Sequence, residues 1–435
     1  MAVDFFCFDG IAISSARAIA YAKTIGSAGG IFWKDCETCG EDFYLIDNEG
    51  VPYTDPETDE VPWYSAKEPE SADWFGLVIT GIEGLDFAPT LRGVTDRIND
   101  GGQFARQRRG PREVRVTAVS LGRTCTAAWW GARWLNEQLR EPSCGAGCGG
   151  VDLEYFLNCP DFKGSCIVPN VPSALDTAIA PYKRTLYNVA LTEGVLLEDQ
   201  IHLARCCKGD CSLPIIQFVF TAADPWAFTV PTVAVEGGTV FPCAGSGTCP
   251  TWTIVADDEI PADPCAETPA CEGDAICGVV ASPPDPPVLR DPCVCDPITL
   301  ATTCFDLDAE DFSDLGQTVP IFTIKAGTDA LRGLSVRFIP RDTGRPLNPC
   351  DTCFEINLPF LNANSTWTFD AARRETMITC GGQTNSATVT GDDGGPLAWP
   401  VFECVPTDYA MCVTLACGAD VTDVEVNISL VTRHG

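Results

Sequence analysis

The sequence predicts a mainly β protein with one principal α-helix, built from an N-terminal β-rich domain and a C-terminal β-sandwich. Short runs rich in β-branched and aromatic residues recur over most of the 435 residues. Only one segment, 124–140, has the apolar spacing of a long amphipathic helix. Residues 231–315 are instead dominated by proline, glycine, cysteine and acidic residues. We therefore expect a first domain over 1–230, a linker or insertion over 231–315 and a sandwich over 316–435.

The N-terminal segment predicts a hairpin followed by a short helix. Asp9-Gly10 lies between two apolar runs, and this pair is typical of a tight hairpin turn. Ser14 or Ser15 can then cap a helix that continues to Lys23. Further along, residues 31–33 and 43–46 are expected to be strands. The acidic, proline-containing segment 51–73 is expected to be an exposed loop, and 74–82 a buried strand.

Residues 111–140 organise the first domain. Apolar and polar residues alternate from Val114 to Val119, which predicts a strand that Gly122 ends. Thr124 or Thr126 can cap the helix that follows. One stripe of this helix carries Ala127, Ala128, Trp130, Ala132, Trp134, Leu135 and Leu139. Because most of the chain predicts strands, we expect this stripe to pack on a sheet.

The later segments complete the two predicted domains. A cysteine- and glycine-rich insertion spans about 141–170, and residues 152–160 within it predict a strand. Residues 184–197 predict a strand pair, and 214–220 a further strand. From 316 onward, strand-like runs separated by glycine-containing turns predict the sandwich.

The order of these segments resembles a known family. The segment from FGLVITGIEGLDFAPT to REVRVTAVSLGRTCTAAWWGARWLNEQL resembles the N-terminal belt domain of phage distal tail proteins. The segment from RTLYNVALTEG to PIIQFVFTAADPWAF resembles the strands that close that domain. The C-terminal segment from PIFTIKAGTDALRGLSVRFIP to FLNANSTWTFDAARRETMI resembles the second, galectin-like domain of the same family. The linker and WPVFEC resemble minor tail proteins of phages that infect actinobacteria.

This resemblance implies a structural protein of the virion tail, made in the host cytoplasm. It would form a ring, usually a hexamer, at the end of the tail tube and carry the tail tip or baseplate. Its partners would be copies of itself and other tail proteins. The resemblance implies no catalysis and no cofactor. The cysteine content and the long linker depart from the family pattern.

Charge and cysteine content restrict the function further. The formal net charge of −32 argues against nucleic acid or an anionic membrane as a partner. The 25 cysteines indicate an oxidising final environment. The N-terminal residues do not have the pattern of a signal peptide, and no apolar run is long enough to span a bilayer. A protein made in the cytosol and later carried outside the cell in a virus particle reconciles these observations.

Cysteine pairs are the weak candidates for a metal site. Cys36 with Cys39 and Cys350 with Cys353 have zinc-knuckle spacing. With so many cysteines such pairs also arise by chance, and disulfides are the more frequent explanation. Residues 306–314 begin like a calcium loop but lack its glycine and closing glutamate. We therefore predict no metal, with structural zinc as the alternative.

Catalysis and carbohydrate binding are the rival functions. The chain has 2 histidines and no nucleophile, zinc-protease or phosphate-loop motif. A glycosidase using carboxylates alone stays open, but 60 acidic residues make that signal uninformative. A cysteine-rich surface module that binds glycans is the main alternative, with Trp399 or Tyr409 as an exposed stacking platform. Trp367 is expected in the core.

A cluster of basic residues is the candidate interface. Arg106, Arg108, Arg109 and Arg112 lie close together in an acidic chain. At a contact between such acidic chains, basic residues would relieve electrostatic repulsion. A solvated turn is the alternative interpretation. Trp129, on the flank of the helical stripe, is the other candidate interface residue.

Overall fold

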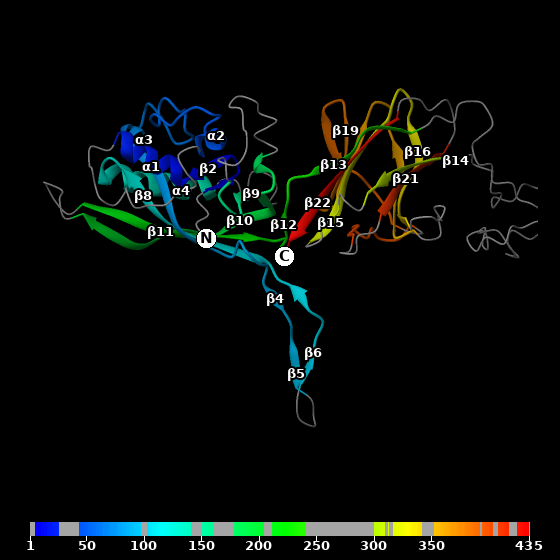
Figure 1. The fold of residues 1–435 in the computed structure, drawn as a ribbon, viewed down its shortest axis with the longest axis horizontal. Coiled ribbons are helices and arrows are strands. Elements are labelled where there is room, and N and C mark those ends of the chain that lie inside the picture. Colours follow the sequence, from blue (N-terminus) through cyan, green and yellow to red (C-terminus); the bar gives the residue numbers. More distant parts are fainter. Residues whose placement is uncertain are drawn as a thin grey trace, which may run out of the picture. The chain divides into compact units, whose positions relative to one another are not determined.

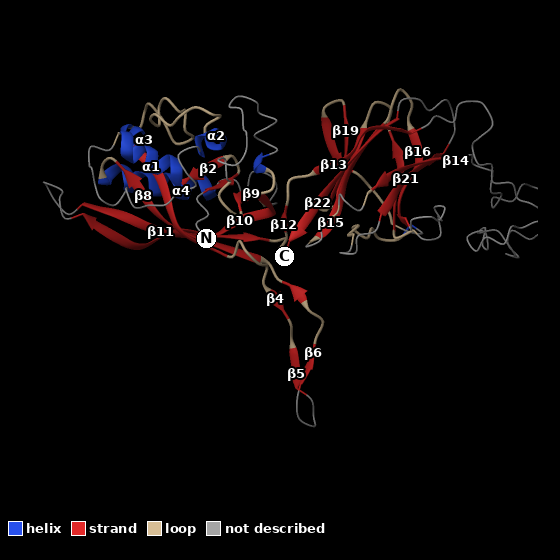
Figure 2. Ribbon diagram, viewed as in Figure 1, coloured by secondary structure: helices blue, strands red, loops and turns tan. Residues whose placement is uncertain are grey.

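The computed structural model describes residues 5–25, 43–96, 102–140, 150–160, 178–203, 211–240, 300–308, 312, 316–341, 352–391, 394–402, 408–416 and 424–434. The fold is mainly β with few helices, as predicted (Figure 2). The chain divides into two compact units, unit 1 (residues 1–230 and 433–435) and unit 2 (residues 231–432). No helix among the described residues is long and apolar enough to cross a bilayer.

Unit 1 contains one antiparallel sheet with helices packed on it (Figure 1). Strand β10 (Lys183–Leu203) pairs with β11 (Cys211–Ala222), which pairs with β8 (Arg112–Gly122). Strand β8 in turn pairs with β3 (Trp74–Glu83). On the same edge as β11, nearer its start, β10 pairs with β12 (Ala227–Phe228), and on its opposite edge it pairs with β9 (Val151–Phe156). Strands β1 (Phe5–Phe8) and β2 (Ile11–Ser14) extend the sheet from β9.

The N-terminal hairpin and helix form as predicted. Asp9 and Gly10 have φ values of 49° and 77°, the left-handed turn that lets β1 pair with β2. Helix α1 (Ser15–Thr24) follows, and its N-cap Ser14 accepts a hydrogen bond from the Arg17 amide. The alternation of large side chains places Phe6 and Phe8 in the core beside Phe220.

Helix α4 (Cys125–Arg140) and strand β8 confirm the prediction for residues 111–140. The Thr124 hydroxyl caps the helix by accepting from the Ala127 amide at 3.1 Å. The stripe positions Ala127, Ala128, Ala132, Leu135 and Leu139 are all buried, so the helix packs on the sheet as expected.

Two of the three tryptophans of α4 pack against aromatic residues of the same chain. Trp130 and Trp134 pack against Trp74 of β3, with ring centroids 6.1 and 5.5 Å apart. Trp63 packs against Trp74 at 4.8 Å and donates its indole N–H to the Trp74 carbonyl. A Cβ at Gly131 would lie 2.1 Å from the Trp74 ring, so the close approach of α4 to β3 requires glycine there.

Three predictions for unit 1 are wrong. Residues 43–46 are not a strand, because Tyr44–Asp47 form the short helix α2. Segment 51–73 is not simply an exposed loop: Val61 and Trp63 are buried, and it ends in helix α3 (Pro69–Asp73). Residues 184–197 are not a strand pair but part of the single long strand β10, which bends through register shifts instead of turning. The predicted strand 31–33 lies outside the described residues.

Unit 2 contains two antiparallel sheets. One has the order β13 (Thr232–Val240), β22 (Val424–His434), β15 (Gln317–Lys325), β18 (Thr366–Asp370), β19 (Glu375–Cys380) and β20 (Gln383–Ser386). The other has the order β14 (Leu300–Leu307), β21 (Asp408–Ala416), β16 (Leu331–Arg341) and β17 (Phe354–Leu361).

Aromatic side chains join these two sheets, as expected for a sandwich. Phe322 of β15 stacks on Phe369 and lies 6.3 Å from Phe338 of β16 in the other sheet. Trp367 is fully buried, which confirms its predicted place in the core. The predicted linker 231–315 is not entirely a linker, because its two ends form β13 and β14 of this unit.

Candidate assembly surface: the arm of residues 84–111

Residues 84–111, which we call the arm, leave the sheet of unit 1 between the end of β3 and the start of β8. Strand β4 (Thr90–Leu91) pairs with β7 (Arg108–Arg109), and β5 (Val94–Asp96) pairs with β6 (Gly102–Phe104). The arm is therefore a two-stranded antiparallel extension, and Figure 1 shows it projecting from the sheet. Residues 97–101, between β5 and β6, lie outside the described residues.

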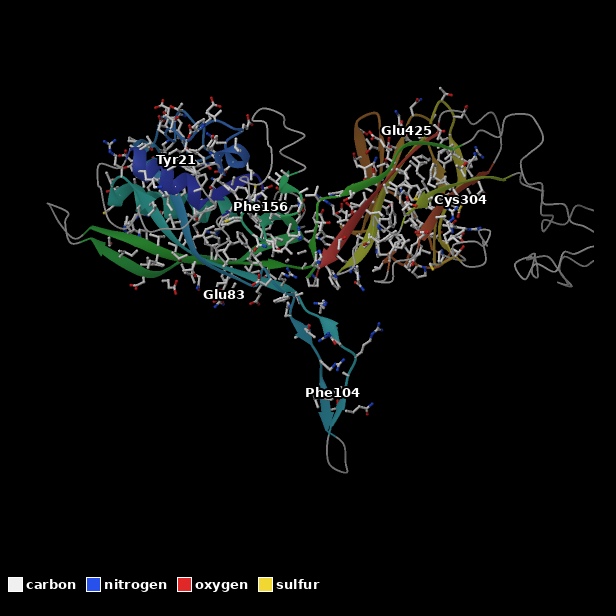
Figure 3. The ribbon with its side chains drawn as sticks, in the orientation of Figure 1. Tyr21, Glu83, Phe104, Phe156, Cys304 and Glu425 are labelled. Atoms are coloured by element: carbon white, nitrogen blue, oxygen red, sulfur yellow. A yellow bond between two sulfur atoms is a disulfide. The ribbon has the colours of Figure 1, made fainter. Side chains whose placement is uncertain are left out.

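The arm exposes large apolar side chains. Phe87, Leu91, Val94 and Phe104 are between 44% and 79% exposed. They are four of the nine large hydrophobic side chains that are exposed in the described parts of the chain. Such a group outside the core is typical of a surface that another protein covers. Phe104 lies toward the end of the arm that is far from the sheet (Figure 3).

The arm is also basic. Residues 84–111 contain five arginines and three aspartates, a net charge of +2 in a chain of net charge −32. The guanidinium of Arg92 lies 5.7 Å from the centre of the Phe104 ring and donates to Gln107, so it links the two sides of the arm. Within the described residues, no ion pair joins Arg92, Arg106, Arg108 or Arg109 to a carboxylate. The arm thus presents cations without local neutralisation.

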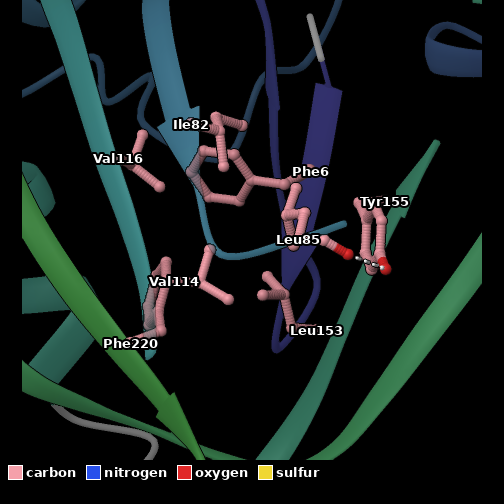
Figure 4. A pocket seen from close by; sticks show the side chains of 8 residues that line it. All are labelled: Phe6, Ile82, Leu85, Val114, Val116, Leu153, Tyr155 and Phe220. Atoms are coloured by element: carbon pink, nitrogen blue, oxygen red, sulfur yellow. Dashed lines mark hydrogen bonds between the residues drawn. The ribbon is translucent and has the colours of Figure 1, made fainter. Parts of the chain in front are cut away.

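The arm root, formed by Gly84, Leu85 and Arg112, is held firmly by the sheet. Gly84 has a φ of 89°, and a Cβ there would lie 1.9 Å from the Glu113 carbonyl oxygen. Only glycine fits this position without moving the backbone. The Leu85 carbonyl accepts a hydrogen bond from Arg112 Nη1 at 3.2 Å. It accepts a second one from the Tyr155 hydroxyl, also at 3.2 Å (Figure 4).

The side chain of Leu85 anchors the root from the inside. It is buried among apolar residues from five strands, including Phe6 of β1 and Leu153 of β9 (Figure 4). Their side chains leave no room for a water molecule. We therefore interpret this place as core packing that fixes the arm, not as a ligand site.

Arg112 is part of the root and not of the outer surface. Its side chain is 1% exposed, and its Nε has no hydrogen-bond partner in the described residues. Burial lowers the pKa of Arg112, partly offset by Tyr155 and Asp86, while burial raises the pKa of Tyr155. The predicted interface role therefore does not suit Arg112: alternation along β8 turns its side chain inward.

Arg109 and a C-terminal arginine lie on one tryptophan beside the root. The Arg109 guanidinium lies 4.8 Å from the centre of the Trp226 ring, and that of Arg433 lies 4.3 Å from it. Cation–π contacts of this kind contribute about 0.5–2 kcal/mol each. Trp226 thereby fixes one side of the arm, and Arg109 is only partly available to another molecule.

The other predicted interface residues are Arg106, Arg108 and Trp129. Arg106 and Arg108 are exposed on the arm. Trp129 is half-buried on the flank of α4 and makes no ring–ring contact within the described residues. The sequence pattern does not predict the four exposed apolar residues of the arm, because they are scattered among polar residues. The sequence does contain one signal for them, which is the presence of large apolar residues in a segment that joins two buried strands.

The predicted metal and carbohydrate residues do not form sites in the described part of the chain. Cys36, Cys39 and Cys350 lie outside it, Cys353 is exposed, and the described residues contain no cluster of metal-ligating side chains. The Trp399 ring packs on Phe369 at 5.1 Å, and Tyr409 packs on Phe402 at 4.7 Å. Each ring therefore has one side committed to the interior of unit 2.

No protein-family model and no curated protein matches this sequence. Among solved structures, the chain is similar to the SPP1 Dit (gp 19.1) protein, described as a paradigm of the hub adsorption apparatus of phages that infect Gram-positive hosts. That alignment has 10% identity and a TM-score of 0.37, and covers 84% of this chain and 96% of the other. Two structures of the phage p2 baseplate in its activated conformation, with Sr and with Ca, align at 10% identity over 81% of this chain and 90% of theirs, with TM-scores of 0.33 and 0.32. These neighbours are phage hub and baseplate proteins, but TM-scores this low do not establish a shared family.

Proposed function

We propose that this chain is a structural protein of a phage tail that assembles with copies of itself through unit 1. The ring would lie at the end of the tail tube and connect the tube to the tail tip or baseplate. The arm is the structural feature that supports the proposed self-assembly. The sequence resemblance to distal tail proteins supplies the tail position and the ring, and unit 2 would face the neighbouring tail proteins.

The arm has the physical properties that an assembly element needs. Burying a large apolar side chain stabilises by about 1.5–3 kcal/mol. The four exposed apolar residues of the arm would thus provide a substantial contact if a neighbouring chain covered them. Because the root is fixed by glycine geometry, two hydrogen bonds and a buried leucine, little conformational entropy is lost when the arm binds. The basic arm also reduces the repulsion between copies of an acidic chain.

Light scattering after size-exclusion chromatography, with negative-stain electron microscopy, tests this role. We expect the full chain to form closed rings, and the double variant Val94→Ser/Phe104→Ser to be monomeric with an unchanged circular dichroism spectrum. The matched control Val233→Ser/Phe360→Ser removes two exposed apolar residues of unit 2 and should leave the rings intact. A full chain that stays monomeric at high concentration would contradict the proposal.

A further inference from the structure

A second exposed apolar group lies on strand β10 of unit 1. Leu196 and Leu197 are 57% and 48% exposed and are followed directly by the exposed carboxylates Glu198 and Asp199. We call these four residues the ribbon patch. Within the described residues, no ion pair involves Glu198 or Asp199. The patch therefore has the apolar character of the arm and the opposite charge.

The patch and the arm root lie at different points along one strand. Strand β11 pairs at Ala222 with Arg112 of the arm root, and at Ile216 with Leu197 of the ribbon patch. Six residues of extended strand separate these points, which is about 20 Å. Unit 1 thus has one basic apolar surface and one acidic apolar surface at distinct places on a single rigid sheet.

The backbone around the patch indicates that side chains provide the recognition. Strand β10 pairs with β9 only as far as Val189, so the stretch that carries the patch has one edge without a strand partner among the described residues. One register shift precedes the patch, between Glu193 and Leu196, and another lies within it, between Leu197 and Asp199. The Val195 amide on this stretch already bonds to Asn136 of α4. Such irregularity discourages the regular addition of a strand and leaves the leucines and carboxylates as the contact groups.

We propose that the arm of one copy docks on the ribbon patch of the next copy. The arm would lie along the unpaired edge of β10, where Leu91, Val94 and Phe104 would contact Leu196 and Leu197, whose side chains leave the strand on opposite faces. Arg106 and Arg108 would then face Glu198 and Asp199. This inference rests on the proposed self-assembly and specifies the two surfaces that perform it. Since the two surfaces differ, the contact is head-to-tail, the type that builds rings when its rotation closes.

Charge reversal with mixing tests the head-to-tail contact. Arg106→Glu/Arg108→Glu makes the arm acidic, and Glu198→Arg/Asp199→Arg makes the patch basic. Each variant alone presents like charges to its own copies, so we expect at least a tenfold loss in the apparent assembly constant. In an equal mixture every arm meets a patch of opposite charge, so rings of alternating variants should form. The measurement is mass by light scattering, with ring shape by electron microscopy.

The control separates this contact from a general effect of charge. Lys67→Glu/Arg133→Glu changes the net charge as much as the arm variant does, at exposed positions away from both surfaces, and should assemble like the unmodified chain. Rings that persist in both reversed variants, or a mixture that does not assemble, would overturn the head-to-tail contact while the proposed function stands. Loss of assembly in the control to the same extent would overturn it too. If the unmodified chain never assembles, the proposed function falls together with this inference.

Discussion

The two units differ in where they place large apolar side chains. Of the nine that are exposed in the described residues, seven belong to unit 1 and two to unit 2. Both units have an aromatic cluster in the core or packed against it: Trp63, Trp74, Trp130 and Trp134 in unit 1, and Phe322, Trp367 and Phe369 in unit 2. The difference therefore does not come from a weak core in unit 1. Under the proposed self-assembly, the exposed apolar residues of unit 1 are those that a neighbouring copy would cover.

A cystine cross-links two strands of unit 2. Cys304 of β14 and Cys412 of β21 are directly opposed in the strand register and form a disulfide. It joins residues that are 108 positions apart, and it fastens the edge strand of one sheet to its neighbour. Unit 1 also contains cystines, since Cys125 and Cys159 are disulfide-bonded. Its arm, in contrast, contains no cysteine.

Removing the unit 2 disulfide should have the largest effect on stability. In the chain-entropy model, a cross-link over a loop of this length stabilises by about 4–5 kcal/mol. We expect Cys304→Ser/Cys412→Ser to lower the free energy of unfolding of unit 2 by about that amount. Hydrogen exchange read by mass spectrometry should show faster exchange in β14 and β21 and no change in β3 and β8. Equal acceleration in both units would mean that the two do not unfold independently.

Truncating the central tryptophan of unit 1 comes next. Trp74 is fully buried, contacts Trp63, Trp130 and Trp134, and donates its indole N–H to the Ser120 hydroxyl at 3.0 Å. Replacing a buried tryptophan by alanine costs about 3–5 kcal/mol because it leaves a cavity. We expect Trp74→Ala to lower the stability of unit 1 by that amount in denaturant unfolding.

Trp129→Ala is the matched control for Trp74→Ala. Its ring is half-buried and outside the tryptophan cluster, so the loss should be roughly 1 kcal/mol. If the two substitutions cost the same, the cluster would not be the centre of the unit 1 core. A loss of assembly in Trp129→Ala without a loss of stability would support its predicted interface role.

Much of this fold follows from local sequence patterns. The Asp9-Gly10 turn, the capped helix after Gly122 and the alternation in β8 are determined by neighbouring residues, so the sequence predicts them correctly. The segments that the sequence predicts wrongly depend on long-range packing. Trp63 is buried because Trp74 and Trp134 provide a surface for it, although the segment 51–73 around it is acidic and contains several prolines. Likewise, Arg112 is buried because Leu85 and Tyr155 accommodate it across the sheet.

The sequence predicts the candidate assembly surface on the arm only from its cluster of arginines. Four clustered arginines stand out in an acidic sequence, but which of them faces solvent depends on the strand register and on Trp226, more than 100 residues away in the sequence. The apolar half of the site, Phe87, Leu91, Val94 and Phe104, has no periodicity, because two-residue and three-residue strands are too short to show one. Tertiary structure is needed to recognise both halves as one surface.

A substitution at the arm root should cost less stability than the cystine or Trp74 substitutions, but it should act specifically on the arm. Gly84→Ala combines a left-handed backbone, which costs about 1–2 kcal/mol, with a clash between its Cβ and the Glu113 carbonyl. We expect a stability loss of about 2–3 kcal/mol. Gly50→Ala is the matched control, because Gly50 has a φ of 81° but no atom near the position of a Cβ, so its loss should be about 1 kcal/mol. The additional stability loss of Gly84→Ala, compared with Gly50→Ala, should coincide with faster hydrogen exchange at residues 84–86 and 112–114 and with weaker assembly. If assembly is unaffected although exchange at the root increases, the arm would not need a fixed direction, and its apolar and charged side chains alone would determine the contact.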